Sequence, residues 1–120
     1  MDLVINILFV LIVAFFLINK LLPVKGVRQI STSDLKKELK RKDVQFIDVR
    51  TPGEFSRNNI NTFKNIPLHD LSQKASQLSK EKEVVVICQS GIRSNKTTKL
   101  LRKMGFQKIT NVKGGMSAWN

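Results

Sequence analysis

The chain has 120 residues, and its apolar and charged residues are segregated. All 21 Lys and Arg lie from Lys20 onward, whereas one of the nine acidic residues, Asp2, precedes it, so the part from Lys20 carries a net charge of +13. About 95 residues remain after the apolar N-terminus, enough for one hydrophobic core. A single cysteine excludes an intramolecular disulfide, and with one histidine it excludes the usual four-ligand zinc sites. We expect neither a metal nor an organic cofactor.

An apolar run covers Leu3–Leu22, where sixteen of twenty residues are Leu, Ile, Val or Phe. Twenty helical residues span about 30 Å, the thickness of a bilayer hydrocarbon core. A cleaved signal peptide and a buried core helix are the alternatives. The acidic start at Asp2 and the lack of a small-x-small cleavage motif favour a retained anchor over a signal peptide. We therefore expect residues 1–22 to anchor the protein in a membrane.

The flanking charges predict the orientation of this anchor. Lys20, Lys25 and Arg28 follow the span, and only the free amino terminus precedes it. The positive-inside rule then predicts a single-pass protein with its C-terminal domain in the cytoplasm, joined by a linker at residues 23–27. The basic domain either lies against anionic lipid or carries a solvated surface with no partner. Scattered basic residues and few aromatic ones argue against nucleic-acid binding.

Strand-like and helix-like segments alternate after the linker. We expect strands at residues 27–30, 44–49, 84–88 and 109–112, and helices that begin near residues 31 and 52 or cover residues 70–78 and 94–104. This alternation indicates an α/β fold, a parallel sheet with helices on both faces. The apolar run VVVIC at 84–88 is typical of a strand buried on both sides. Ligands of such sheets bind beyond the carboxyl ends of the strands, where Asp48, Arg50 and Cys88 stand.

A loop from Cys88 to Ser94 joins that buried strand to a helix. Gly91 permits a turn with positive φ, so that backbone N–H groups converge, and the helix N-terminus and Arg93 add positive charge. These surroundings favour the thiolate, which is the nucleophilic form of cysteine. We expect Cys88 to be catalytic and the loop to bind an anion. The alternative is that Cys88 is a small buried apolar residue at a strand end.

Several segments, in this order, resemble a single rhodanese domain over residues 28–120: Asp48-Val49-Arg50 with Pro52-Gly53-Glu54-Phe55, then Asn65-Ile66-Pro67-Leu68, VVVICQSGIRS, Gly105-Phe106, and Val112-Lys113-Gly114-Gly115-Met116-Ser117-Ala118-Trp119. The resemblance implies a rhodanese-like fold and a sulfurtransferase activity. In that reaction a cysteine takes a sulfane sulfur from an anionic donor such as thiosulfate or a polysulfide, and passes it to a thiol or cyanide-like acceptor. It implies that Cys88 carries the persulfide and that the loop residues bind the substrate: Gln89, Ser90, Gly91, Ile92, Arg93 and Ser94.

Residues outside the loop fit the resemblance less closely. Asp48 and Arg50 are expected beside the loop, where a structural pair, with Arg50 bonded to Glu54 or to nearby backbone, is favoured over a direct role. The family's usual Gly-His-Ile-Pro-Gly-Ala stretch is replaced at residues 58–63, where only the Ile is retained. Phe63 then stands where a small residue is usual, which implies an altered pocket wall.

Two other functions remain open at this point. One is a non-catalytic module that displays the rhodanese fold to a partner at the membrane, and the intact loop around Cys88 counts against it. The other is a phosphatase or arsenate reductase of the same fold. Those relatives separate cysteine and arginine by five residues, whereas four residues separate Cys88 from Arg93. The tighter loop favours a sulfur atom over a phosphate.

Overall fold

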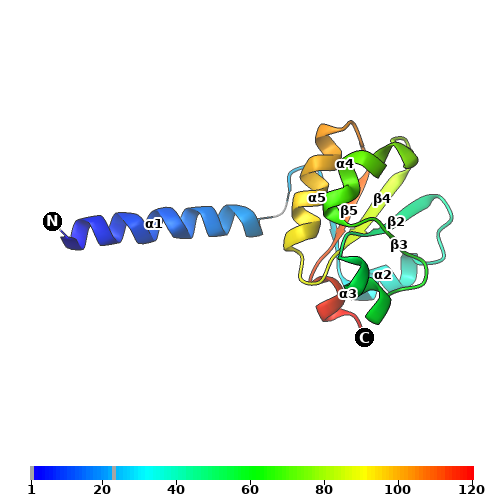
Figure 1. Ribbon diagram of the computed structural model, residues 1–120, viewed down its shortest axis with the longest axis horizontal. Coiled ribbons are helices and arrows are strands. Elements are labelled where there is room, and N and C mark those ends of the chain that lie inside the picture. The colour runs from blue at the N-terminus through cyan, green and yellow to red at the C-terminus, as the bar shows by residue number, and fades with distance from the viewer. Residues whose placement is uncertain (1, 23) are drawn as a thin grey trace.

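The computed structural model describes residues 2–22 and 24–120 as an N-terminal helix followed by an α/β domain (Figure 1). Pro23, at the start of the expected linker, lies outside the described residues. The elements are α1 (Asp2–Leu21), β1 (Arg28–Ile30), α2 (Thr32–Glu38), β2 (Val44–Asp48), α3 (Pro52–Arg57), β3 (Lys64–Asn65), η1 (Leu68–Asp70), α4 (Leu71–Lys74), η2 (Ala75–Gln77), β4 (Glu83–Ile87), α5 (Ile92–Lys103), β5 (Ile109–Val112) and η3 (Gly115–Ala118), where η is a short 3-10 helix.

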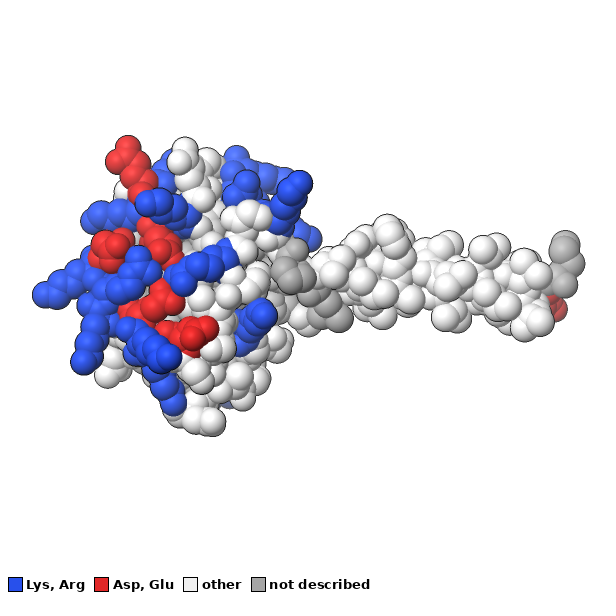
Figure 2. Space-filling model, turned by 180° about the vertical axis from the view of Figure 1, so that it is seen from behind, with Lys and Arg blue, Asp and Glu red and all other residues white. Residues whose placement is uncertain are grey.

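Helix α1 extends away from the domain with its apolar side chains exposed (Figure 1). Residues Asp2–Asn19 are long and apolar enough to cross a membrane, and none of them is buried against the rest of the described structure. The helix is therefore not part of the core of the described domain. A signal sequence meets the same criteria of length and composition. Figure 2 shows that the Lys and Arg side chains gather on the domain, and residues 3–19 of α1 include no charged residue.

The five strands form one parallel sheet in the order β1-β5-β4-β2-β3. Strand β4 lies in the centre, and its residues 84–87 are fully buried, as the continuous apolar run predicts. It pairs with β2 from Val44 opposite Glu83 to Asp48 opposite Ile87. The carboxyl ends of β2 and β4 therefore lie side by side, and Cys88 follows the central strand.

Helices cover both faces of the sheet, as the alternating pattern predicts (Figure 1). On one face α4, η2 and α5 contribute Leu71, Ala75 and Leu101 to a core that includes Val84 and Val86. The other face is covered by α2, α3 and η3 and has a second core: Ile30, Leu35, Phe46, Ile60, Phe63, Val85, Ile87, Val112 and Met116. Alternate residues of β4 point to opposite cores, which fixes the register of the strand.

Two local predictions differ from the structure. The single helix expected at residues 70–78 is three short pieces, because Asp70 and Lys74 adopt ψ values of −8° and −7° and neither cap has a side-chain hydrogen bond. Strand β3 was not predicted, since it has only two residues and both are polar. A capping box is present at the start of α2, as the spacing of three residues between Ser31 and Asp34 predicts.

The chain leaves α1 alongside α5. The side-chain amide of Asn95 donates to the carbonyl of Leu22 at 3.3 Å, and Arg102 Nη1 donates to the carbonyl of Gly26 at 3.3 Å. Both donors belong to α5, whose N-terminus follows the Cys88 loop. Leu22 and Gly26, which lie between α1 and β1, therefore contact the same helix that begins at the candidate site.

Candidate active site

Cys88 lies directly after the central strand β4, with 1% of its surface exposed. The loop ends at Gly91, where φ is +113°, and α5 begins at Ile92, two residues earlier than the sequence predicts. A left-handed residue at this position favours glycine, because a side chain there would be strained. The loop thus turns sharply enough to bring its own backbone over the sulfur.

Three hydrogen bonds close the loop around the sulfur atom. The Gly91 N–H donates to Cys88 Sγ at 2.9 Å, and the Cys88 thiol donates to Ser94 Oγ at 3.3 Å. The Ser94 hydroxyl in turn donates to the carbonyl of Gly91 at 3.0 Å. A backbone N–H at this distance stabilises negative charge on the sulfur, and the rotatable Ser94 hydroxyl is able to donate to a thiolate instead.

Gly115 supports the loop from behind. It is buried, with φ +55°, and a Cβ there would overlap the carbonyl oxygen of Cys88. The Met116 N–H donates to that same oxygen at 2.8 Å, and the Ser117 N–H donates to the carbonyl of Gln89 at 2.9 Å. The Gly114-Gly115 pair indicates a turn, but nothing in the neighbouring sequence predicts that this turn packs against the Cys88 loop.

Arg93 forms a two-point ion pair with Glu54 of α3. Arg93 Nη1 and Nη2 donate to Glu54 Oε1 and Oε2 at 2.6 and 2.9 Å. These hydrogen bonds lower the pKa of Glu54 to about 2, helped by the Thr51 N–H, and Glu54 raises the pKa of Arg93. The Arg93 guanidinium, which was expected to bind an anionic substrate, thus binds the Glu54 carboxylate. Binding of the anionic sulfur donor by Arg93 stays a prediction. Sequence reasoning did not identify Glu54 as a site residue.

Asp48 and Arg50 form a buried ion pair beside the loop, with 0% and 2% of their surfaces exposed. Arg50 Nε donates to both carboxylate oxygens of Asp48 at 3.1 Å, and Nη2 donates to Oδ2 at 2.9 Å. The same guanidinium donates to the carbonyls of Glu54 and Asn58 and to Gln89 Oε1. The pair therefore links β2, α3 and the loop, which is the arrangement of a structural pair.

Three cavities border residues of the loop. One of about 390 Å³ is lined by Arg50, Glu54, Arg57, Asn58 and Gln89, and another of about 430 Å³ lies along α5 beside Ile92 and Arg93. Ile92 is 54% exposed. A third cavity, of about 200 Å³, lies between Ser90, Gly91 and strand β5. Cys88 is not among the residues that line these three cavities.

In the altered stretch at residues 58–63, Phe63 packs in the core and Asn58 lines a cavity beside the loop. Phe63 is 4% exposed and packs edge-to-face on Phe46, with ring centroids 5.2 Å apart. Phe63 belongs to the core and is not among the residues that line the three cavities beside the loop. Asn58 lines the cavity beside Arg50 instead. Within residues 2–22 and 24–120, no group of three or more His, Cys, Asp or Glu is arranged to hold a metal ion.

Comparisons with known proteins show the family of this α/β domain. The family described as "Rhodanese-like domain" matches residues 31–120, so the chain belongs to the rhodanese-like family.

Individual relatives extend this assignment. The Bacillus subtilis protein YqhL is 41% identical over 62% of this chain and 60% of its own length. A protein named sulfurtransferase from Allochromatium vinosum is 32% identical over 78% of this chain and 88% of its own length. The crystal structure of a rhodanese-like domain protein from Staphylococcus aureus superposes with a TM-score of 0.72 at 34% identity, covering 78% of this chain and 92% of that one.

Proposed function

We propose that this protein is a sulfurtransferase in which Cys88 carries the transferred sulfur as a persulfide. One observation carries the proposal: the Gly91 N–H donates to Cys88 Sγ at 2.9 Å, in the loop that directly precedes the N-terminus of α5. Backbone donors and a helix N-terminus stabilise an anion at this position. Both a thiolate and a Cys–S–S⁻ group are such anions.

The reaction has two displacement steps. The Cys88 thiolate attacks the sulfane sulfur of a donor such as thiosulfate, the donor S–S bond breaks, and sulfite leaves with the electron pair. A thiolate or cyanide acceptor then attacks the outer sulfur of the persulfide, and Cys88 leaves as a thiolate. No electrons are gained or lost overall, and no cofactor is needed. The loop N–H groups stabilise the charge that returns to Cys88 in the second step.

The competing functions fit the site less well. Only four residues separate Cys88 from Arg93, and the arginine fork faces Glu54 rather than standing free for a tetrahedral oxyanion. These features disfavour a phosphatase or arsenate reductase. A non-catalytic module would not require a cysteine held by both Gly91 and Ser94. Sulfur transfer is therefore the function that this geometry supports best.

The test is a mass measurement on the full chain in detergent. Incubation with thiosulfate should add the mass of one sulfur atom to the peptide that contains Cys88, and cyanide should remove it and yield thiocyanate. Cys88→Ser should acquire no such mass while it retains the thermal unfolding of the wild-type chain. A folded wild-type protein that never acquires the sulfur atom would leave the non-catalytic module as the better function.

We further propose that residues 1–22 anchor the protein in a membrane, that 23–27 form the linker, and that 28–120 are a cytoplasmic rhodanese domain. The exposed apolar surface of α1 and the basic residues Lys25 and Arg28 behind it support this topology. Added protease should digest the domain in inverted vesicles and leave it intact in right-side-out ones. Release of the intact chain by carbonate would contradict a spanning helix.

A further inference from the structure

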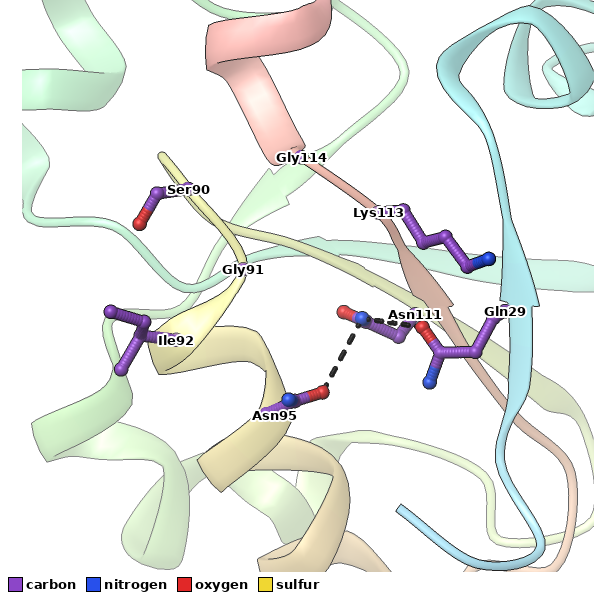
Figure 3. A pocket seen from close by; sticks show the side chains of 8 residues that line it. All are labelled: Gln29, Ser90, Gly91, Ile92, Asn95, Asn111, Lys113 and Gly114. Carbon is purple, nitrogen blue, oxygen red and sulfur yellow. Dashed lines mark hydrogen bonds between the residues drawn. The ribbon is translucent and has the colours of Figure 1, made fainter. Parts of the chain in front are cut away.

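The chain directly after α1 is held against α5 by a series of side-chain amides. Asn95 of α5 donates to the carbonyl of Leu22 at 3.3 Å, and Asn95 Oδ1 accepts from Asn111 Nδ2 of β5 at 3.5 Å. Asn111 also donates to Gln29 Oε1 of β1 at 2.9 Å, and Figure 3 shows the contacts among these three amides. Because Asn95 and Asn111 are both buried, the end of α1 is fixed to side chains inside the domain.

This attachment sets the direction of α5 relative to α1. The two helices contact each other, and α5 runs across the end of α1, on the side of the domain that faces it (Figure 1). A spanning helix tilts by at most about 40° from the bilayer normal. With α1 in the membrane, α5 therefore lies along the membrane surface. Its contact with Leu22 places it within the Debye length, which is about 8 Å at physiological salt.

One face of α5 combines lysines with an exposed apolar residue. Ile92, Lys96, Lys99 and Lys103 are exposed and recur at intervals of three or four residues, so they lie on one side of the helix, which we call the α5 face. Ile92 is 54% exposed, and outside residues 3–22 it is the only large apolar side chain so exposed in the described part of the chain. Figure 3 shows it pointing away from strand β5. Lysines beside an exposed apolar side chain are typical of a helix that lies in a membrane interface.

The positive charge of the α5 face is not neutralised by neighbouring residues. Helix α5 contains no Asp or Glu, and none of the three lysines of the face forms an ion pair with a described residue. Among the described side chains, Figure 2 shows Lys and Arg but no acidic residue on the part of the domain nearest α1, whereas the acidic side chains of the domain gather farther away. The side of the domain next to the anchor is therefore positively charged.

We propose that the α5 face binds the anionic lipid headgroups of the membrane that α1 spans, and so holds the Cys88 loop at the membrane surface. The inference rests on the topology proposed above. The lysine ammonium groups bind headgroup phosphates, and the Ile92 side chain enters the interface. Gly91, whose N–H donates to Cys88 Sγ, directly precedes Ile92, so docking fixes the loop beside the headgroups. An acidic protein is disfavoured as the partner, because the bilayer already lies on this side of the domain.

The experiment places the full chain, labelled with nitrogen-15, in two kinds of lipid nanodisc. One contains phosphatidylcholine alone, and the other also contains phosphatidylglycerol, which is anionic. A small fraction of the lipid in both carries a gadolinium chelate on its headgroup, which relaxes nearby amide signals. We expect the relaxation of the Ile92 and Lys99 amides to be at least about threefold stronger in the anionic disc, because each lysine near anionic lipid favours the docked state about fivefold. Added salt should reduce this difference.

Two double variants separate the α5 face from net charge. Lys96→Gln with Lys99→Gln should lower the relaxation of the Ile92 amide in the anionic disc at least about threefold. The matched control, Lys37→Gln with Lys64→Gln, removes the same charge from exposed positions on α2 and β3 and should behave as wild type. Ile92→Ser keeps every lysine and should also lower the relaxation of the Lys99 amide. All five positions are exposed, so these changes leave the fold intact.

The outcomes distinguish docking from the anchor and from sulfur transfer. Cys88→Ser should dock as wild type, so a chain that docks but acquires no sulfur would contradict sulfur transfer alone. Release of the chain from vesicles by carbonate would overturn the spanning helix and this proposal with it. Equal relaxation in both discs, or an equal loss in both double variants, would overturn the docking and leave the anchor in place.

Discussion

Arg93 and Glu54 lie 39 residues apart in sequence and meet through two hydrogen bonds of 2.6 and 2.9 Å. Glu54 also accepts from the Thr51 N–H, which completes the capping box of α3. One carboxylate therefore closes the first turn of α3 and holds the first turn of α5. Arg93, the one charged residue of the loop from Cys88 to Ser94, therefore joins this loop to α3.

A double-mutant cycle should reveal this coupling. Glu54→Gln and Arg93→Met should each destabilise the domain, and the double variant should lose less than the sum of the two. The Arg93 side chain is 34% exposed and the Glu54 side chain is 26% exposed. Because solvent screens such a pair, we expect a coupling energy of roughly 0.5–1 kcal/mol. Urea unfolding followed by the fluorescence of Trp119, the single tryptophan, measures it. Strict additivity would show that the ion pair does not stabilise the fold.

The same pair should shape the response to acid. Folding lowers the pKa of Glu54 from its ordinary value of 4.5 to about 2, so the folded state favours the ionised carboxylate. Its stabilising contribution is complete above the ordinary pKa and is lost as the pH falls through the folded value. The stability difference between wild type and Glu54→Gln should be constant above about pH 5 and shrink toward pH 2. A difference that stays constant down to pH 2 would contradict this assignment.

Gly115→Ala should damage the loop that holds Cys88. The new Cβ would overlap the Cys88 carbonyl oxygen, and φ at this position is +55°. We expect a loss of about 2 kcal/mol or more in the free energy of unfolding. Gly53→Ala is the matched control, because it lies in α3 and its Cβ would come no closer than 3.7 Å to Arg57. That change should stabilise the domain by up to about 1 kcal/mol, and equal losses in both variants would exclude the steric explanation.

Asp48→Asn should be among the most destabilising single changes. It leaves the buried Arg50 guanidinium without its counter-charge, which costs about 3–5 kcal/mol. Asp48→Leu combined with Arg50→Met removes both charges and should recover part of this loss. The comparison is made by urea unfolding of the full chain in detergent. A double variant less stable than Asp48→Asn would mean that the hydrogen bonds of Arg50 to Asn58 and Glu54 dominate instead.

The elements with strong local patterns were predictable from sequence. Strand β4 was found within one residue, because its apolar run permits burial on both faces. The capping box at Ser31 and the loop at Gly91 were also recognised, since each depends on residues within a few positions. Strand β3 carried no such pattern, since only its pairing with β2 makes Lys64–Asn65 a strand.

The parts of the site that sequence reasoning missed all join distant positions. Glu54 was recognised in a motif segment, but nothing local indicates that its partner is Arg93. The contact between Gly115 and Cys88 depends on the return of the chain after β5. Asn111 and Gln29 are 82 residues apart and meet only because β5 lies beside β1. Side-chain pairing across a sheet is set by the completed fold and leaves little trace in neighbouring residues.

The first strand of the domain pairs only with the last. Strand β1 runs beside β5, with Arg28 opposite Thr110 and Ile30 opposite Val112. During synthesis β1 leaves the ribosome first, and its partner is among the last segments to follow. The sheet therefore cannot be completed until almost the whole domain has been translated. The pairing of β1 with β5 joins the most distant parts of the domain, and such contacts form slowly. Until then the cysteine strand lacks the neighbour that shields it, so the nascent domain depends on prompt completion of its C-terminus.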